Sequence, residues 1–143
     1  MKSILLFTIA LCLYAPGNLL AQQHAHTTST GNSEVSFAII RQQILADKGL
    51  ENREVKLLIV DFPPNSTSTA HRHPCPTFGY VLEGEIESVF EGKTYLYKKG
   101  DSFYEETNGL HSSARNNHPT APAKLLVFFL AEKGKPTSVP EKK

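Results

Sequence analysis

The stretch AHRHPCPTFGYVLEG, residues 70–84, places two histidines one residue apart, directly before an apolar run that ends at a glycine. The run TFGYVLEG has the length and the aromatic and β-branched content of a strand. Residues i and i+2 of a strand point to the same face, so His71 and His73 present both imidazoles on one side. The stretch therefore predicts a β-strand protein with a pair of adjacent histidines.

Runs of the same kind fill the chain between residues 35 and 131, with turn residues between them. They read EVKLLIVDF, EIESVFEG, KTYLYKKG, DSFYEE, LHSSARN and AKLLVFFLAE. The segments EIESVF and KTYLYK, joined around Glu91 and Gly92, predict a hairpin. Residues 37–47 match both helical and strand spacing, and we assign them to a strand because β-branched residues are frequent there. The pattern therefore predicts one all-β barrel domain.

The first 21 residues have the three parts of a secretory signal peptide, with Lys2 before an apolar run and a small residue, Ala21, at the expected cleavage site. Export to the periplasm or the medium is therefore expected. Residues 22–34 are small and polar and predict a disordered lead-in, and residues 132–143 predict a polar tail. Cleavage removes Cys12, so Cys75 remains as a single thiol and no internal disulfide is expected.

Charge is balanced along the chain. Removing Lys2 with the signal reduces the 15 basic side chains to 14, which equals the 14 acidic ones, and no basic run is present. Neither nucleic acid nor, after signal cleavage, a membrane is expected as a partner.

Two imidazoles hold a metal ion weakly, so a third ligand is expected from elsewhere in the chain. His111 is the natural candidate, because it begins another short strand just after a turn. Cys75 is an alternative soft ligand or, between two prolines, a small buried residue at a strand bend. His24 and His26 repeat the HxH spacing in the polar lead-in, where a flexible pair binds metal adventitiously, and His118 is expected in an exposed loop.

These residues resemble the two sequence motifs of the cupins, small barrels of the double-stranded β-helix type. Motif 1 corresponds to Asn65, His71, His73, Thr77 and Gly84, and motif 2 to Gly100, Glu106, Asn108, His111 and Arg115. The resemblance covers about residues 35–131. It departs from the family at Thr77, which stands where motif 1 has a glutamate, so the three histidines lack the usual carboxylate partner.

The cupin resemblance implies a single-domain, jelly-roll-like barrel that binds one divalent transition metal, whether Fe, Mn, Zn, Ni or Cu, through His71, His73 and His111. It also implies a small-molecule ligand and, because AKLLVFFLAE is apolar on both faces, a homodimer. Two functions remain open. One is a metal-dependent enzyme of the dioxygenase or lyase/isomerase type acting on a small organic molecule, and the other is a non-catalytic module that binds or senses a small ligand or the metal.

Glu105 is the candidate catalytic residue, because it can supply the missing carboxylate. In the strand SFYEE, alternation places Glu105 on the same face as Phe103 and Glu106 on the opposite face with Tyr104. If that face points inward, Glu105 can accept a proton or bind the metal. The alternative is a solvated glutamate at the rim of the barrel.

Overall fold

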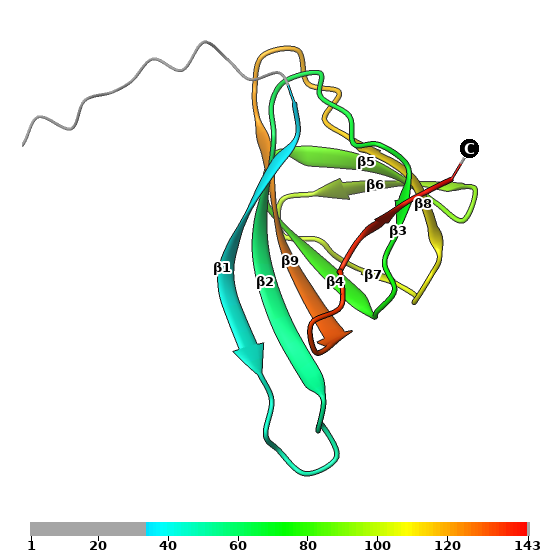
Figure 1. The fold of residues 1–143 in the computed structure, drawn as a ribbon. Helices are drawn as coiled ribbons and strands as arrows, with labels where there is room; N and C mark the ends of the chain where they lie inside the picture. Colours follow the sequence, from blue (N-terminus) through cyan, green and yellow to red (C-terminus); the bar gives the residue numbers. More distant parts are fainter. Residues whose placement is uncertain (1–33, 143) are drawn as a thin grey trace, which may run out of the picture.

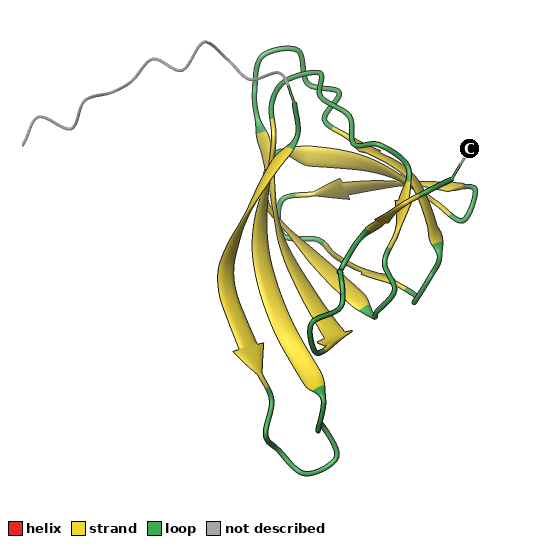
Figure 2. Ribbon diagram, in the orientation of Figure 1, coloured by secondary structure: helices red, strands yellow, loops and turns green. Residues whose placement is uncertain are grey.

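The computed structural model describes residues 34–142, and all regular secondary structure within this range is strand (Figure 2). No helix in this range is long and apolar enough to cross a bilayer. The predicted signal peptide and residues 22–33 of the predicted lead-in lie outside the described residues. Within residues 34–142, ten strands form two five-stranded sheets in which all strand pairs are antiparallel.

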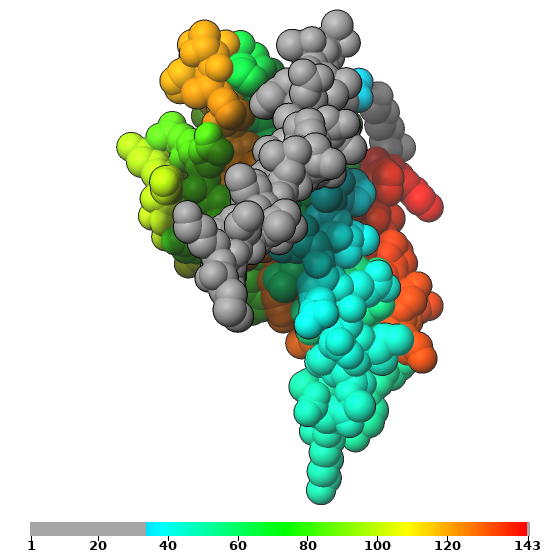
Figure 3. Space-filling view, turned by 90° about the vertical axis from the view of Figure 1, so that its left-hand side faces the viewer, coloured from blue at the N-terminus to red at the C-terminus, as the bar shows by residue number. Residues whose placement is uncertain are grey.

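The first sheet has the strand order β1-β2-β9-β4-β7. Its strands are β1 (Ser36–Ile44), β2 (Arg53–Phe62), β9 (Ala123–Glu132), β4 (Thr77–Glu83) and β7 (Ser102–Glu105). β1 is an edge strand and all nine of its residues are exposed. Part of this segment (cyan) lies on the surface in Figure 3. Its formation confirms the strand assignment for residues 37–44, since β-branched residues pair well along an extended neighbour, whereas residues 45–47, also assigned to the strand, lie beyond its end.

The second sheet has the order β10-β3-β8-β5-β6. Its strands are β10 (Val139–Pro140), β3 (His71–Arg72), β8 (Leu110–Arg115), β5 (Glu85–Phe90) and β6 (Lys93–Lys98). The predicted hairpin is present as β5 and β6, which pair from Glu85–Lys98 to Phe90–Lys93. At its tip Glu91 and Gly92 both have positive φ, 48° and 71°, as a two-residue turn with the twist of the strands requires.

The two sheets face each other across a shared interior (Figure 1). β9 contributes side chains to this interior. Its residues alternate between buried and half-buried, with Leu125, Val127 and Phe129 inside. Val81 of β4 and Ile86 of β5 join them in one cluster. Such alternation is the period of a strand with one face in a core. The predicted all-β barrel is confirmed.

The chain passes from one sheet to the other at Gly84, between β4 and β5. Gly84 has φ +71°, and a Cβ there would lie 2.8 Å from the carbonyl oxygen of Pro122 and 2.8 Å from the Cβ of Ala123. Both the backbone conformation and the close approach of the chain before β9 therefore require glycine. This residue is also the glycine that ends motif 1.

The C-terminal segment, for which the sequence predicts only a polar tail, returns to the barrel. β10 pairs with β3, so that Val139 lies opposite Arg72 and Pro140 opposite His71. Arg72 donates to Glu141 over 2.7 Å, and the amide of Glu141 donates to the carbonyl of Ala70. These contacts hold the segment beside the first histidine.

We predict that Gly84→Ala lowers the free energy of unfolding by roughly 2 kcal/mol or more, because it adds a contact with backbone atoms to the cost of a left-handed conformation. Gly92→Ala is the matched control, since Gly92 also has φ +71° but no atom within 4 Å of its added Cβ. Urea unfolding of both variants checks the difference. Equal losses would show that the contact with Pro122 and Ala123 contributes nothing.

Candidate metal centre

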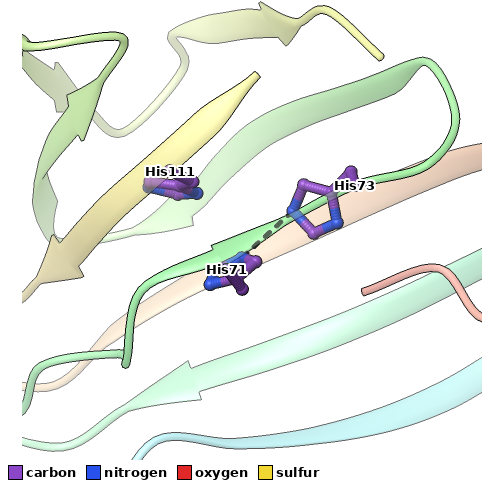
Figure 4. A group of neighbouring side chains, drawn as sticks. All are labelled: His71, His73 and His111. Carbon is purple, nitrogen blue, oxygen red and sulfur yellow. Dashed lines mark hydrogen bonds between the residues drawn. The ribbon is translucent and has the colours of Figure 1, made fainter. Parts of the chain in front are cut away.

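The register of β3 and β8 brings two histidines from distant parts of the chain together. His71 lies directly opposite His111, and their ring centroids are 4.9 Å apart. His73, just past the end of β3, places its ring centroid 4.7 Å from that of His71. One nitrogen from each of the three rings lies within 4.8 Å of the other two (Figure 4). The structure thus gathers the three histidines that the sequence singles out.

The hydrogen bonds of His71 and His73 leave two lone pairs facing each other. Nδ1 of His71 lies 2.7 Å from the carbonyl oxygen of Thr69, and Nδ1 of His73 lies 2.6 Å from that of Thr137. A carbonyl accepts, so each Nδ1 carries the proton and each Nε2 of the neutral ring is an acceptor. The two Nε2 atoms are nevertheless only 3.2 Å apart.

A cation between these two nitrogens removes the repulsion between their lone pairs. Neighbouring ligands on an ion with metal–nitrogen bonds of roughly 2.1 Å are separated by roughly 3.0 to 3.4 Å, depending on the angle at the metal. The observed 3.2 Å falls in this range. Fixing the Nδ1 proton on a carbonyl is also how proteins orient metal-binding histidines. The pair fits a divalent transition metal.

Burial favours the uncharged form of both rings. The pKa of His71 and the pKa of His73 are lowered, chiefly because the surrounding protein removes water from the ring. Both imidazoles are therefore neutral near pH 7, which is the form that donates a lone pair to a metal.

His111 adds a third acceptor beside a carboxylate. Its Nε2 is 3.0 Å from Oγ of Ser88, on β5, and its Nδ1 is 3.2 Å from Oε1 of Glu105. The orientation of Nδ1 and Oε1 does not form a hydrogen bond, and neither buried atom has another partner among the described residues. Oε2 of Glu105 lies 3.4 Å from Nε2 of His73. Three imidazoles and one carboxylate therefore lie together, and both groups are ligands that divalent metals accept.

Glu105 occupies the side of the site where motif 1 lacks its glutamate. Thr77 of β4 lies directly opposite Glu105 of β7, and both are buried, with 1% and 3% of their surface exposed. The inward orientation deduced from Phe103 is confirmed, and the alternative of a solvated rim glutamate is wrong. The carboxylate absent at Thr77 is thus present on the neighbouring strand.

A cavity of about 620 Å³ between the sheets opens onto the three histidines. β2 and β9 supply its apolar wall, and the ring of Phe129 lies 5.0 Å from that of His73. Thr77, Glu105 and His111 line the same cavity. A small molecule held there lies beside the candidate metal centre.

The other residues considered as metal ligands are not part of this cluster among the described residues. Cys75 is buried in the core cluster, as expected for a small residue at a bend, and burial raises the pKa of its thiol. Among the described residues it does not join the group of histidines. His118 is exposed and accepts backbone hydrogen bonds from Thr120 and Ala121 in a turn, which confirms its loop position. His24 and His26 lie outside the described residues.

Two residues that orient the histidines were not predicted. Ser88 contacts His111 from β5, and Thr137 receives the Nδ1 proton of His73 through its carbonyl oxygen. Ser88 sits at an inward position of its strand, so alternation could have marked it as buried. Nothing in the sequence marks Thr137, because its contribution is a backbone atom.

The fold and the histidine cluster define a small double-stranded β-helix barrel with a candidate metal centre. The family model described as "Cupin domain" matches residues 58–129, and the chain belongs to the cupin family. This confirms the family resemblance and fold class given by the motifs.

The curated relatives include the cupin-domain-containing oxidoreductase srdB of Neurospora crassa, 30% identical over 71% of this chain. The chain spans about half of that protein, 48% of its length. Among solved structures, a double-stranded β-helix protein of Klebsiella pneumoniae matches at TM-score 0.59 and 20% identity, covering 79% of this chain and 89% of that one. The DMSP lyase DddQ of Ruegeria pomeroyi matches at TM-score 0.54 and 22% identity, covering 62% of this chain and 45% of that one. These structures show similarity of fold.

We predict that Glu105→Gln weakens Zn²⁺ binding at least about 10-fold, because the carboxylate beside His73 and His111 is lost. Glu106→Gln, which changes the exposed neighbouring carboxylate, is the control and leaves the affinity unchanged. Returning a carboxylate from the opposite strand, in the double variant Thr77→Glu/Glu105→Gln, restores part of the loss. Competition titration with a chromophoric chelator at pH 7 measures all four proteins. Glu105→Gln binding Zn²⁺ as tightly as Glu106→Gln would contradict this.

Proposed function

We propose that this cupin binds one divalent transition metal through His71, His73 and His111 and acts on a small organic molecule as a metal-dependent enzyme. The observation that carries the proposal is the 3.2 Å approach of two Nε2 acceptors whose Nδ1 protons are held by carbonyls. Fe, Mn, Zn, Ni and Cu all accept imidazole ligands, so the donor set leaves the choice of metal open.

Glu105 is the proposed catalytic residue of this site. A bound divalent metal supplies Lewis-acid or oxygen chemistry. The carboxylate of Glu105 lies at the cavity wall, so it can accept a proton from a molecule held there and return it to the product. The apolar wall excludes water around that molecule, which strengthens the interaction of the carboxylate with it. Dioxygenase and lyase/isomerase reactions both suit this arrangement.

The unpaired oxygen of Glu105 favours an enzyme over a non-catalytic binding module. A buried carboxylate oxygen without a hydrogen bond destabilises the fold, and groups of this kind are typical of functional sites. The Neurospora relative is named an oxidoreductase, which also supports an enzyme. The match covers about half of that protein, 48% of its length.

We predict that the protein, purified without chelators or added ions, contains close to one transition metal ion per chain. His71→Ala and His111→Ala lose this ion, whereas the exposed His118→Ala retains it, as metal analysis by mass spectrometry measures. Substituting His24 and His26 by alanine in every sample removes adventitious binding by that pair. With metal loaded, a panel of small organic molecules is screened for oxygen uptake and for product mass.

Turnover that Glu105→Gln abolishes would support the enzyme. Wild-type protein that carries no metal and cannot be loaded would contradict the proposal. Ligand binding without turnover would favour the binding module instead.

We also propose that the chain forms a homodimer through the outer face of the first sheet. Phe78, Tyr80 and Tyr104 are 47%, 44% and 54% exposed, and the strand register places them beside Leu126 and Phe128. We call these five residues the outer aromatic patch. A two-fold interface must be complementary to itself, and an uncharged patch meets a second copy without repulsion. Contiguous exposed apolar surface of this kind typically marks an interface.

We predict that Phe78→Glu/Tyr104→Glu weakens the dimer at least about 100-fold, because it buries like charges at the centre of the contact. Leu96→Glu, which replaces an exposed apolar residue of β6 in the other sheet, leaves association unchanged. Sedimentation equilibrium distinguishes the two variants. A wild-type protein that stays monomeric at high concentration would disprove the dimer.

Export to the periplasm or medium is proposed from the sequence of residues 1–21. We predict that the mature protein recovered from that compartment begins near residue 22, as intact mass and N-terminal sequencing measure. A full-length chain that is retained in the cell would contradict export.

A further inference from the structure

After β9 the chain crosses from the first sheet to the second and ends beside the histidines. β9 belongs to the first sheet, whereas β10 pairs with β3 of the second (Figure 1). We call residues 136–142, which make this crossing, the C-terminal strap. Thr137, Ser138 and Pro140 line the cavity, and Pro140 lies opposite His71 in the ladder. The strap therefore forms the part of the cavity wall next to the histidines.

The strap holds one of the three histidines through a backbone atom. The carbonyl oxygen of Thr137 is 2.6 Å from Nδ1 of His73 and accepts its proton, so Nε2 of the neutral ring keeps its lone pair. Within residues 34–142, Nδ1 of His73 has no other hydrogen-bond partner. If the strap leaves β3, the proton is free to move to Nε2, and that nitrogen can then no longer bind a metal.

The strap is held mainly by polar contacts near its end. The two residues of β10 pair with β3, and the amide of Glu141 donates to the carbonyl of Ala70 over 3.1 Å. Thr137 is half-buried and the other residues of the strap are exposed. A segment that buries so little surface opens locally at a low cost in free energy. Its docked state therefore depends on these polar contacts.

Arg72 ties the end of the strap to the histidine cluster. It lies between His71 and His73, so strand alternation directs its side chain to the opposite face. Its Nε and Nη2 groups donate to the two carboxylate oxygens of Glu141, over 2.7 and 3.3 Å. Its Nη1 group donates to the carbonyl of Asn108 over 2.6 Å, in the turn before β8. One guanidinium thus joins the strap, β3 and the turn that precedes the strand of the third histidine.

We infer that Arg72 and Glu141 are positioning residues of the metal centre, because their ion pair keeps the strap docked and the docked strap holds His73 in the tautomer that binds metal. The inference rests on the proposed function, since it takes the histidine cluster as a metal site. Loss of such an orienting partner typically costs roughly 10- to 100-fold in metal affinity. By linkage, a metal bound to His73 stabilises the docked strap to the same extent.

Zinc titration of the full chain tests this role. Arg72→Lys and Glu141→Gln are each expected to weaken Zn²⁺ binding at least about 5-fold, in competition with a chromophoric chelator at pH 7. Lysine keeps the positive charge but cannot form the fork, so a loss in Arg72→Lys does not arise from a changed electrostatic field. Glu132→Gln, which removes an exposed carboxylate at the end of β9, is the control and leaves the affinity unchanged. Wild-type affinity in both Arg72→Lys and Glu141→Gln would overturn the inference.

The tautomer of His73 provides a readout that needs no metal. In the metal-free, ¹⁵N-labelled wild type, long-range ¹H–¹⁵N correlation spectra are expected to show Nδ1 of His73 protonated, with the signal assigned from its loss in His73→Gln. Glu141→Arg repels Arg72 and is expected to shift part of the population to the Nε2-protonated form. The double variant Arg72→Glu/Glu141→Arg reverses the ion pair and is expected to restore the wild-type spectrum. An unchanged tautomer in Glu141→Arg would contradict the positioning role.

The proposed function is tested separately, by whether the wild type binds zinc. A wild type that never binds zinc, but whose His73 tautomer changes in Glu141→Arg and returns in the double variant, supports the positioning role and contradicts the proposed function. Tight zinc binding that neither Arg72→Lys nor Glu141→Gln weakens supports the metal centre and contradicts the inference.

Discussion

The site depends on one unfavourable contact, the 3.2 Å approach of the Nε2 atoms of His71 and His73. Each ring is held by a carbonyl that takes its Nδ1 proton, so neither can turn to relieve the contact without losing that hydrogen bond. Burial also keeps both rings neutral, because it lowers their pKa. A metal cation between the nitrogens would satisfy them both. The antiparallel register that sets His111 opposite His71 then supplies a third nitrogen.

The carboxylate of the site lies on β7, opposite the position of β4 where motif 1 has its glutamate. Thr77 holds the position that motif 1 gives to a glutamate, and Glu105 faces it across the β4–β7 ladder. Opposite residues of antiparallel strands lie within about 5.5 Å of each other at Cβ, so a carboxylate on either strand reaches the same point between the sheets. The site therefore contains a buried carboxylate although Thr77 lacks one. A motif defined by residue spacing along one strand does not identify a carboxylate on the strand opposite.

Local patterns predicted most of this molecule from the sequence. The β5–β6 hairpin followed from Glu91 and Gly92, and the burial of Glu105 from its alternation with Phe103. The histidine cluster followed from spacing, together with the resemblance to the two cupin motifs. What escaped prediction depends on long-range pairing. The return of β10 to β3 and the carbonyl of Thr137 at His73 arise from a polar segment with no hydrophobic pattern, and pairing of this kind leaves no local signal.

We propose that His71, His73 and His111 hold a single metal ion beside Glu105. The most direct measurement is a crystal structure of the zinc-loaded protein with anomalous scattering collected at the zinc edge. We expect one strong anomalous peak bound by nitrogens of His71, His73 and His111 at roughly 2.0 to 2.1 Å, with the carboxylate of Glu105 beside the ion. A peak at other residues, no peak after loading, or Glu105 turned away from the ion would contradict it.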